Sequence, residues 1–202
     1  MNSIIFNNQQ IIPSKVVCVG RNYVEHIKEL GNEMPSSMVL FNKPNSSITD
    51  TLIDNYDGKC HYEGEISFLI QNKKITGIGF GLDLTKRDIQ SKLKSKGLPW
   101  ERAKAYDNSA VFSDFVKIEN LSSLKLELWI NNELKQSGGF TLMIYKPQQI
   151  LEEILSFMSL EDGDIIMSGT PKGVGTYKKG DQFIGKIFAG EKLLVQKKWI
   201  VL

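Results

Sequence analysis

Two glutamates two residues apart give this sequence its clearest chemical signal. Glu63 and Glu65 lie in the segment 61–70, His-Tyr-Glu-Gly-Glu-Ile-Ser-Phe-Leu-Ile, which is rich in the aromatic and β-branched residues of a strand. Side chains alternate along a strand, so both carboxylates point to the same side, roughly 6.6 Å apart along the backbone. Two like charges beside an apolar run cost free energy unless a cation lies between them, and a hard divalent ion fits that role. The alternative is an edge strand with two solvated acids.

A third carboxylate follows on the next predicted strand. The stretch 75–83 alternates apolar side chains with glycines, and Asp83 ends the glycine face. A glycine face leaves room for another group to approach closely. Asp83 also precedes residues 84–88, which begin a predicted helix, so it either caps that helix or joins Glu63 and Glu65 around one Mg²⁺ or Mn²⁺ ion. Water or substrate would complete the octahedron.

A histidine and a glutamate share one face of a predicted helix. His26 and Glu29 are three residues apart, which places them side by side on a helix. A carboxylate beside an imidazole fixes its tautomer and stabilises its charged form, as a general base requires. An exposed pair without a role has the same spacing.

Two further segments carry polar groups whose use the residues alone leave open. Residues 168–175, Ser-Gly-Thr-Pro-Lys-Gly-Val-Gly, lack the Gly-Lys-Ser/Thr ending of a Walker loop. They form either a structural turn or a turn whose backbone amides and Thr170 hydroxyl hold an anion such as a carboxylate. Lys104, taken alone, is expected to be a surface lysine.

Short strands dominate the elements that must position these groups. Pro147 suits the first position of a helix, and the residues after it form one apolar stripe. The helices expected are 23–30, 85–96 and 147–158. Turns at 131–132 and 189–191 predict two hairpins. The pattern indicates an α+β fold with a few peripheral helices. The strands expected are 4–6, 15–19, 38–42, 62–70, 75–82, 124–130, 164–168, 183–187 and 192–201.

Size and composition narrow the class of protein. The chain has 202 residues, so we expect one domain over 1–202, large enough to bury roughly 70% of its unfolded surface. A net charge of +2 does not favour a nucleic-acid binder. No run approaches the roughly 18 apolar residues of a membrane span, and the N-terminus lacks a secretion signal. Two cysteines suit a reducing compartment. We therefore expect a cytoplasmic protein that binds neither nucleic acids nor membranes.

Six short motifs follow one another in order between Gly20 and Gly175. They are Gly-Arg-Asn-Tyr at 20–23 with His26 and Glu29, Phe-Asn-Lys-Pro at 41–44, Tyr-Glu-Gly-Glu at 62–65, Leu-Asp-Leu-Thr-Lys-Arg-Asp-Ile-Gln at 82–90, Gly-Leu-Pro-Trp at 97–100 with Ala-Lys at 103–104, and the turn at 163–175. Together they resemble the fumarylacetoacetate hydrolase family. The chain is most similar to its short single-domain branch of acylpyruvases and oxaloacetate decarboxylases. The resemblance implies a strand-rich mixed β-sandwich roll and a homodimer.

The resemblance also implies roles for individual residues. The carboxylates that match the family's Mg²⁺ or Mn²⁺ ligands are Glu63, Glu65 and Asp83. The residues that match its catalytic groups, a dyad on a lid segment and a lysine near the metal, are His26, Glu29 and Lys104. The residues expected to contact the substrate are Arg21, Gln90 and Thr170. The hydroxyl of Thr170 is expected to hold the substrate carboxylate.

The activity that the resemblance implies is metal-dependent chemistry on small 2-oxo acids. A hydrolase or lyase would cleave acylpyruvates, decarboxylate oxaloacetate, or do both, through a metal-bound pyruvate enolate. The alternatives are an isomerase or tautomerase of oxaloacetate or of unsaturated dioates of the 2-hydroxyhepta-2,4-diene-1,7-dioate type, and a non-catalytic metal-binding module that kept the fold. Residues 107–113 depart from the family pattern near the expected pocket, so the resemblance does not determine which substrate is preferred. Lys86 replaces a usual alanine and is expected on the exterior of a helix.

Overall fold

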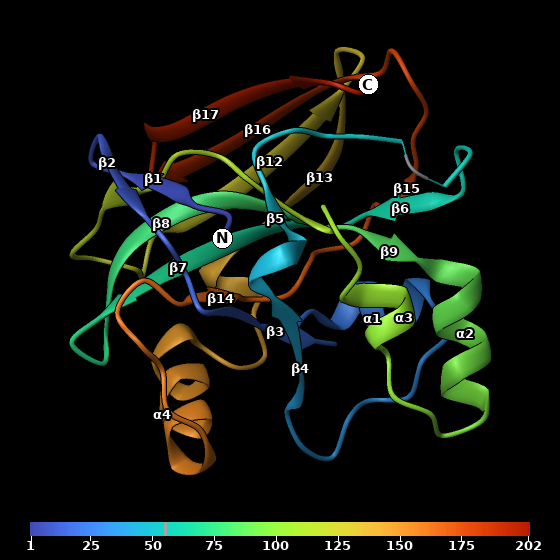
Figure 1. The fold of residues 1–202 in the computed structure, drawn as a ribbon, viewed down its shortest axis with the longest axis horizontal. Coiled ribbons are helices and arrows are strands. Elements are labelled where there is room, and N and C mark those ends of the chain that lie inside the picture. The colour runs from blue at the N-terminus through green and yellow to red at the C-terminus, as the bar shows by residue number, and fades with distance from the viewer. Residues whose placement is uncertain (55) are drawn as a thin grey trace.

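Strands make up more of the chain than helices do, as Figure 1 shows. The structure, a computed structural model, describes residues 1–54 and 56–202. The strands of the largest sheet are β3 (Lys15–Gly20), β4 (Val39–Pro44), β5 (Ile48–Thr49), β7 (Gly64–Gln71), β8 (Lys74–Asp83), β10 (Ala110–Phe112), β11 (Val116–Lys117) and β14 (Ile165–Met167). In space they follow the order β4-β3-β14-β7-β8-β10-β5, with β11 also beside β8. The sheet is mixed, because β14 runs parallel to β3 and antiparallel to β7.

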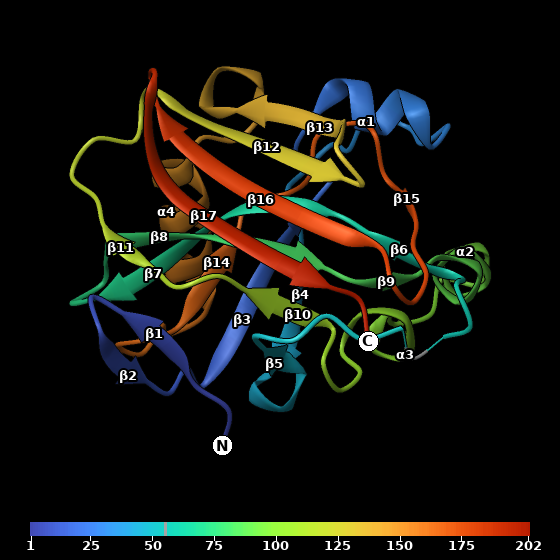
Figure 2. The ribbon, with the colours of Figure 1, turned by 90° about the horizontal axis from the view of Figure 1, so that it is seen from above.

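A second, antiparallel sheet lies over the first (Figure 2). Its strands are β12 (Leu124–Ile130), β13 (Glu133–Gly139), β16 (Gln182–Ala189) and β17 (Lys192–Ile200). The spatial order is β13-β12-β16-β17. The predicted two-residue turn between β12 and β13 is confirmed, with positive φ angles of 50° at Asn131 and 68° at Asn132. Asparagine tolerates this conformation better than most residues. The strand-rich roll expected from the sequence is therefore the observed architecture.

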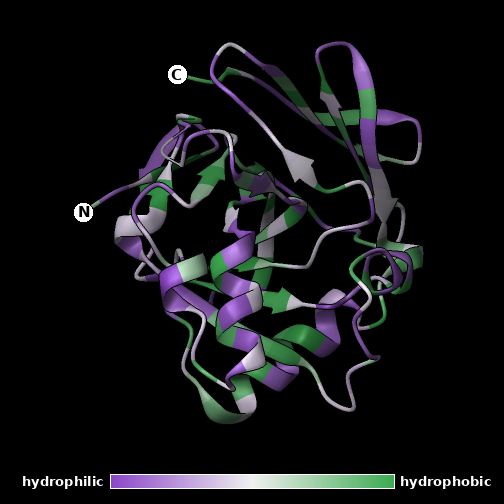
Figure 3. Ribbon diagram, turned by 90° about the vertical axis from the view of Figure 1, so that its right-hand side faces the viewer, coloured by the Kyte–Doolittle hydropathy of each residue, from purple (hydrophilic) through white to green (hydrophobic). Residues whose placement is uncertain are grey.

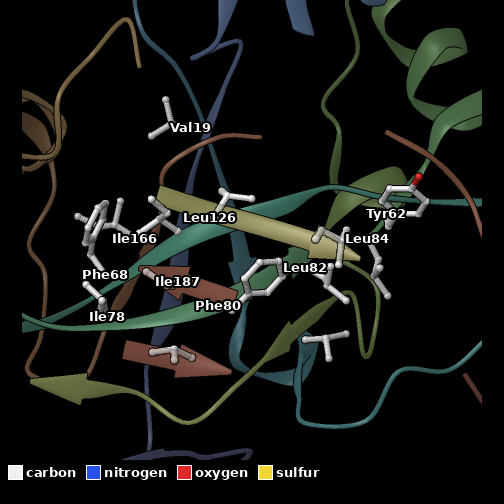
Figure 4. Close-up of a cluster of buried hydrophobic side chains, with 14 of the residues drawn as sticks. Val19, Tyr62, Phe68, Ile78, Phe80, Leu82, Leu84, Leu126, Ile166 and Ile187 are labelled. Atoms are coloured by element: carbon white, nitrogen blue, oxygen red, sulfur yellow. The ribbon is translucent and has the colours of Figure 1, made fainter. Parts of the chain in front are cut away.

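Apolar side chains fill the space between the two sheets and also cover the outer face of the large one. Figure 4 shows Phe80 of β8 in the inner cluster with Leu126 of β12 and Ile187 of β16, all fully buried. On the outer face, the predicted glycine positions of β8 do admit close neighbours. A Cβ atom built on Gly79 would lie only 2.9 Å from the ring of Phe115. Aromatic core residues therefore occupy the room that these glycines leave.

The described residues form four helices outside the sheets: α1 (Val24–Glu29), α2 (Arg87–Ser95), α3 (Glu101–Lys104) and α4 (Pro147–Phe157). The first three lie at one end of the sheets and α4 lies at the other in both Figure 1 and Figure 2. Figure 3 faces the end with α2 and shows many hydrophilic residues on the helices there. The predicted apolar stripe of α4 is buried through Ile150, Leu151 and Ile154. Helix α3 was not predicted.

The predicted strand 62–70 is in fact two strands. Residues Cys60–Tyr62 form β6, Glu63 stands between the strands, and β7 begins at Gly64. The break occurs because β6 pairs in a separate small sheet with β9 (Thr85–Lys86) and β15 (Gly175–Thr176). The same pairing delays the predicted helix at 85–96, which begins only at Arg87. The remaining elements are the hairpin β1 (Ile4–Phe6) and β2 (Gln9–Ile11), and the 3-10 turns Asn45–Ser47 and Phe140–Leu142.

Lys86 lies in β9 and not on the exterior of a helix, so that expectation was wrong. Its Nζ atom stands 4.3 Å from the ring centre of Tyr106 and 5.0 Å from that of Tyr56. Within residues 1–54 and 56–202, no helix is long and apolar enough to cross a membrane.

Candidate active site

The hairpin of β7 and β8 brings the three predicted acids together. Glu63 precedes β7 and lies opposite Asp83 at the end of β8, where the amide of Asp83 donates a hydrogen bond of 2.9 Å to the Glu63 carbonyl. Glu65 follows within β7. One carboxylate oxygen of each residue lies within 4.8 Å of the others. All three side chains are buried, so the alternative of solvated acids on an edge strand is wrong.

Lys104 inserts its ammonium group between two of these acids. Its Nζ atom lies 2.8 Å from Glu63 Oε2 and 2.6 Å from Asp83 Oδ2, and it also donates to Thr85 Oγ1 at 2.6 Å. The residue is 2% exposed, so the expectation of a surface lysine, drawn from the residue type alone, was wrong. It lies at the end of α3, whose last residues turn inward toward the acids.

Two more cations reach the acids from segments to which the sequence gave no role. Lys43 of β4 is fully buried, with its Nζ atom 2.8 Å from Asp83 Oδ1 and 3.0 Å from the Ser109 carbonyl. Arg87, the first residue of α2, pairs with Glu63 Oε1 and donates to Gln90 Oε1 at 2.7 Å. Three buried carboxylates are thus matched by three nearby cations.

The nearby cations offset the negative charges of the three acids to different extents. Burial would raise the pKa of Glu63, but the charges of Lys104 and Arg87 outweigh it and hold that pKa well below its usual value. Glu65 has the opposite balance: burial, then the charges of Asp83 and Glu63, raise its pKa well above the usual value. In the described part of the chain, the hydrogen bond that Glu65 receives is the 2.8 Å one from the Gly169 amide. Its charge is the least compensated of the three.

These donors suit a hard divalent ion. All are carboxylate oxygens, which Mg²⁺ and Mn²⁺ prefer. Asp83 Oδ1 is buried and, among the described residues, has no partner with hydrogen-bond geometry despite the nearby Lys43 ammonium. An ion between the three groups would coordinate that oxygen and neutralise Glu65. The residues present therefore fit the metal that was expected.

The predicted dyad is formed, with its histidine buried and its glutamate exposed. His26 Nδ1 lies 3.0 Å from Glu29 Oε2, and His26 is only 6% exposed, so the imidazole is not a surface group. A carboxylate only accepts hydrogen bonds, so Nδ1 carries the hydrogen and the Nε2 of a neutral ring is free to accept a proton. The other oxygen of Glu29 accepts a 2.9 Å hydrogen bond from the Gly173 amide. This bond ties α1 to the turn at 168–175.

The three residues predicted to bind substrate differ in whether their polar atoms already have hydrogen-bond partners within the protein. Thr170 Oγ1 already donates to the Gly64 carbonyl at 2.9 Å and accepts from Gln136 Nε2 at 2.8 Å, so a substrate carboxylate would have to displace one of these partners. Gln90 accepts from Arg87. Arg21 has a φ of 58° and a buried Nε atom without a hydrogen-bond partner among the described residues.

One cavity unites nearly all of these groups. Eight of the nine predicted site residues line it, and Glu29 is the exception because it lies behind His26. The predicted residues that line the cavity are Arg21, His26, Glu63, Glu65, Asp83, Gln90, Lys104 and Thr170. Acids, a base and cations therefore face a single small volume at the end of the sheets.

Comparison with known proteins agrees with this arrangement. Residues 15–192 match the family model described as fumarylacetoacetate (FAA) hydrolase C-terminal. The chain belongs to the fumarylacetoacetate hydrolase family. The resemblance inferred from the motifs is thereby confirmed.

Relatives of this family member carry several activities in their names. Oxaloacetate tautomerase of Escherichia coli is 39% identical over 188 residues, which cover 84% of this chain and 86% of that protein. A mitochondrial oxaloacetate decarboxylase of Dictyostelium discoideum is 37% identical over 187 residues, or 82% and 85% of the two chains. The crystal structure of fumarylpyruvate hydrolase from Pseudomonas aeruginosa, in complex with Mn²⁺ and pyruvate, aligns with a TM-score of 0.88 at 26% identity over 100% of this chain and 95% of that one.

In this fumarylacetoacetate hydrolase family protein, several residues of the cavity wall were not predicted from the sequence. Lys43 lies in the quoted motif at 41–44, which gave a signal without a role. Lys94 was not predicted as a site residue, yet it lines the cavity. Phe41 and Trp100, whose rings pack 5.7 Å apart, provide an apolar part of the wall. Only their position in the fold brings them to the site.

Proposed function

We propose that this protein is a divalent-metal-dependent enzyme that enolises small 2-oxo acids, and that oxaloacetate tautomerisation is its main reaction. The observation that carries the proposal is one cavity lined by both the cluster of Glu63, Glu65 and Asp83 and by His26, whose ring Glu29 holds from behind. The names of the curated relatives support oxaloacetate as the substrate. A non-catalytic metal-binding module would need no base in the same cavity.

The chain's own residues divide the work of this reaction. Mg²⁺ or Mn²⁺, held by Glu63, Glu65 and Asp83, would supply Lewis acidity that favours the enolate of a 2-oxo acid. His26, held in one tautomer by Glu29, takes a proton from C3 at Nε2, and a proton returned to the 2-oxo oxygen completes the enol. Lys104 offsets negative charge as it develops beside the acids. Loss of CO₂ from oxaloacetate would pass through a related enolate and needs no base.

The direct test is a substrate panel with Mg²⁺ and Mn²⁺. The keto–enol conversion of oxaloacetate is followed by the ultraviolet absorbance of the enol, CO₂ release reports decarboxylation, and loss of acetylpyruvate or fumarylpyruvate reports hydrolysis. Tautomerisation faster than the other reactions, and abolished by a chelator, is expected. Wild-type protein that binds the ion and turns over none of these compounds would be a binding module instead.

Hydrolysis of acylpyruvates is the second candidate, because the same dyad is suited to activate a water. That water would attack the distal carbonyl, and cleavage of the C–C bond would leave the enolate of pyruvate. The Mn²⁺ and pyruvate bound to the fumarylpyruvate hydrolase of Pseudomonas aeruginosa lend support to this candidate.

The first prediction separates the reactions by their need for a base. His26→Ala is expected to lower tautomerisation and acylpyruvate hydrolysis by about 10²–10⁴-fold, since both need proton transfer. Decarboxylation of oxaloacetate should fall much less. Metal binding, measured by calorimetry, serves as the control and should not change. Equal losses in all three activities would contradict the role of His26 as the base.

We also propose that the protein works as a homodimer in the cytoplasm. The free and buried cysteines Cys18 and Cys60 suit a reducing compartment. A single-copy mass in light scattering at micromolar concentration would contradict the dimer.

A further inference from the structure

One lysine of α2 differs from its neighbours in what it faces. Lys94 is half-buried and lines the cavity with the acid cluster. Lys92 and Lys96 are exposed and line a separate groove on the outer side of the helix. The cavity therefore receives one ammonium group from α2 in addition to the guanidinium of Arg87.

Lys94 and Arg21 are the cations of the cavity wall that the site acids do not neutralise. Lys104 pairs with Glu63 and Asp83, and Arg87 pairs with Glu63. Within residues 1–54 and 56–202, neither Lys94 nor Arg21 has a carboxylate partner within 4.0 Å. Both line the same cavity. Two unmatched positive charges in a partly buried wall favour a bound anion.

The contacts of Lys94 keep its ammonium group at the wall. Its Nζ atom donates to Asn32 Oδ1 at 2.8 Å and lies 5.7 Å from the ring centre of Trp100. Burial, then the charges of Arg21 and Arg87, lowers the pKa of Lys94 to about 8. Arg21 is also short of partners, because its buried Nε atom has none in the described chain and its NH1 reaches only the Glu33 carbonyl at 3.5 Å.

We propose that Lys94, together with Arg21, binds the carboxylate of the substrate that is remote from the 2-oxo acid group, and that Lys94 thereby selects dicarboxylic over monocarboxylic substrates. The inference rests on the proposed function and deepens it. The acid cluster takes the 2-oxo acid end through the ion, which leaves the unmatched cations for the other end. A charge-assisted hydrogen bond in a cavity is stronger than a neutral one, so the distal charge contributes to discrimination.

The test compares two substrates that differ in one group. Oxaloacetate ends in a carboxylate, whereas acetylpyruvate has a methyl ketone at the same place. In Lys94→Met, the KM for oxaloacetate is expected to rise by about 10- to 100-fold, as for the loss of a hydrogen bond to a charged group, with little change in kcat. The KM for acetylpyruvate should change less than about threefold. Lys94→Arg, which keeps the charge, should restore most of the affinity for oxaloacetate.

Two control variants separate this role from simpler ones. Lys96→Met removes the same charge just after the end of α2, outside the cavity, and should leave both KM values unchanged. Asn32→Leu removes the partner of Lys94 and so tests whether the lysine merely holds the chain after α1. If Asn32→Leu and Lys94→Met raise both KM values alike, Lys94 only holds that segment and the proposal fails. An unchanged KM for oxaloacetate in Lys94→Met would also overturn it.

The role of Lys94 can be tested even if the protein proves not to be an enzyme for these substrates. If wild-type protein turns over neither substrate, the proposed function fails, and calorimetry with Mg²⁺ still decides the role of Lys94. Wild type should then bind oxaloacetate about 10- to 100-fold more tightly than Lys94→Met does. Equal affinities would exclude a carboxylate contact at this residue.

Discussion

At the scale of the residue, Glu65 is the acid whose environment most favours a cation. It is buried beside two other acids, and its pKa is raised well above the usual value by burial and by Asp83 and Glu63. Lys104 and Arg87 reach Glu63, and Lys43 reaches Asp83, but Glu65 has no such ion pair among the described residues. In the protein without metal, ionisation of Glu65 therefore costs stability.

Replacement of Glu65 by glutamine should thus separate metal binding from folding. Glu65→Gln removes one ligand charge and also relieves the repulsion, so the metal-free protein is expected to be as stable as wild type or more so. The gain in melting temperature on addition of Mn²⁺ should be lost. Thermal unfolding with and without the ion measures both effects. Glu119→Gln, at an exposed acid, is the control, and a metal-induced gain equal to wild type in Glu65→Gln would contradict the ligand role.

Lysines show how far residue types alone could predict the site. Lys104 and Lys43 are fully buried, whereas Lys92 and Lys96 are exposed, and nothing in their immediate sequence separates the two groups. The difference arises from carboxylates that lie far along the chain. The acids themselves were predictable because their spacing on two neighbouring strands makes them converge. Lys104 was found only through the family resemblance.

At the scale of the element, Asp164 connects the starts of two strands in the large sheet. Its carboxylate is buried and accepts hydrogen bonds from Ser14, Lys15 and Glu161. Lys15 Nζ also lies 2.6 Å from Asp164 Oδ2. Burial would raise the pKa of Asp164, but these hydrogen bonds outweigh it and hold the pKa below its usual value. The group therefore anchors β14 beside β3.

Substitution of Asp164 should destabilise the fold in a pH-dependent way. Asp164→Asn turns an amide group toward donors that lose their acceptor, so the free energy of unfolding should fall by about 3–5 kcal/mol. The stabilisation by Asp164 is full above about pH 4, where the unfolded carboxyl is ionised, and is lost as the pH falls through the lower folded pKa. Urea unfolding of wild type and variant at pH values above and below about 4 measures this loss of stabilisation.

A neighbouring acid supplies the control for this experiment. Asp162 is exposed and accepts one hydrogen bond, from the Asn72 amide. Asp162→Asn should cost less than about 1 kcal/mol at any pH. Losses of similar size in the two variants would argue against the anchoring role of Asp164.

Elements were predictable where local signals agree with the fold. The alternation of β8 and the asparagine turn after β12 are local, and both were predicted. The break at Glu63 was not, because β6 leaves the large sheet to pair with β9 and β15, and nothing within 62–70 signals that. The late start of α2 has the same cause, since residues Thr85–Lys86 pair with β6.

At the scale of the whole molecule, the two sheets meet where a glycine faces an aromatic ring. A Cβ atom added to Gly185 of β16 would lie 2.5 Å from the Phe80 ring of β8. Phe80 is fully buried and also packs against Trp199, with ring centres 6.1 Å apart. The absence of a side chain at Gly185 therefore sets how closely the sheets approach.

A double-mutant cycle can measure this contact. Gly185→Ala alone should lower the free energy of unfolding by about 1–3 kcal/mol, because the core cannot accept the extra methyl group. In a Phe80→Leu background the ring is gone, and the same change should cost less. A coupling of about 0.5–3 kcal/mol is expected for residues in contact. Additive losses in urea unfolding would show that the sheets do not meet at this position.

The β7–β8 hairpin also bears on the order of assembly during folding. Its residues supply all three clustered acids within 63–83, whereas Lys43, Lys104 and His26 come from outside that stretch. Local hairpins form sooner than contacts between distant segments. The acids therefore meet while their cationic partners are still elsewhere, and repulsion opposes closure of the hairpin. A divalent ion present at that moment would screen the carboxylates, so this protein should refold faster with Mg²⁺ than with a chelator.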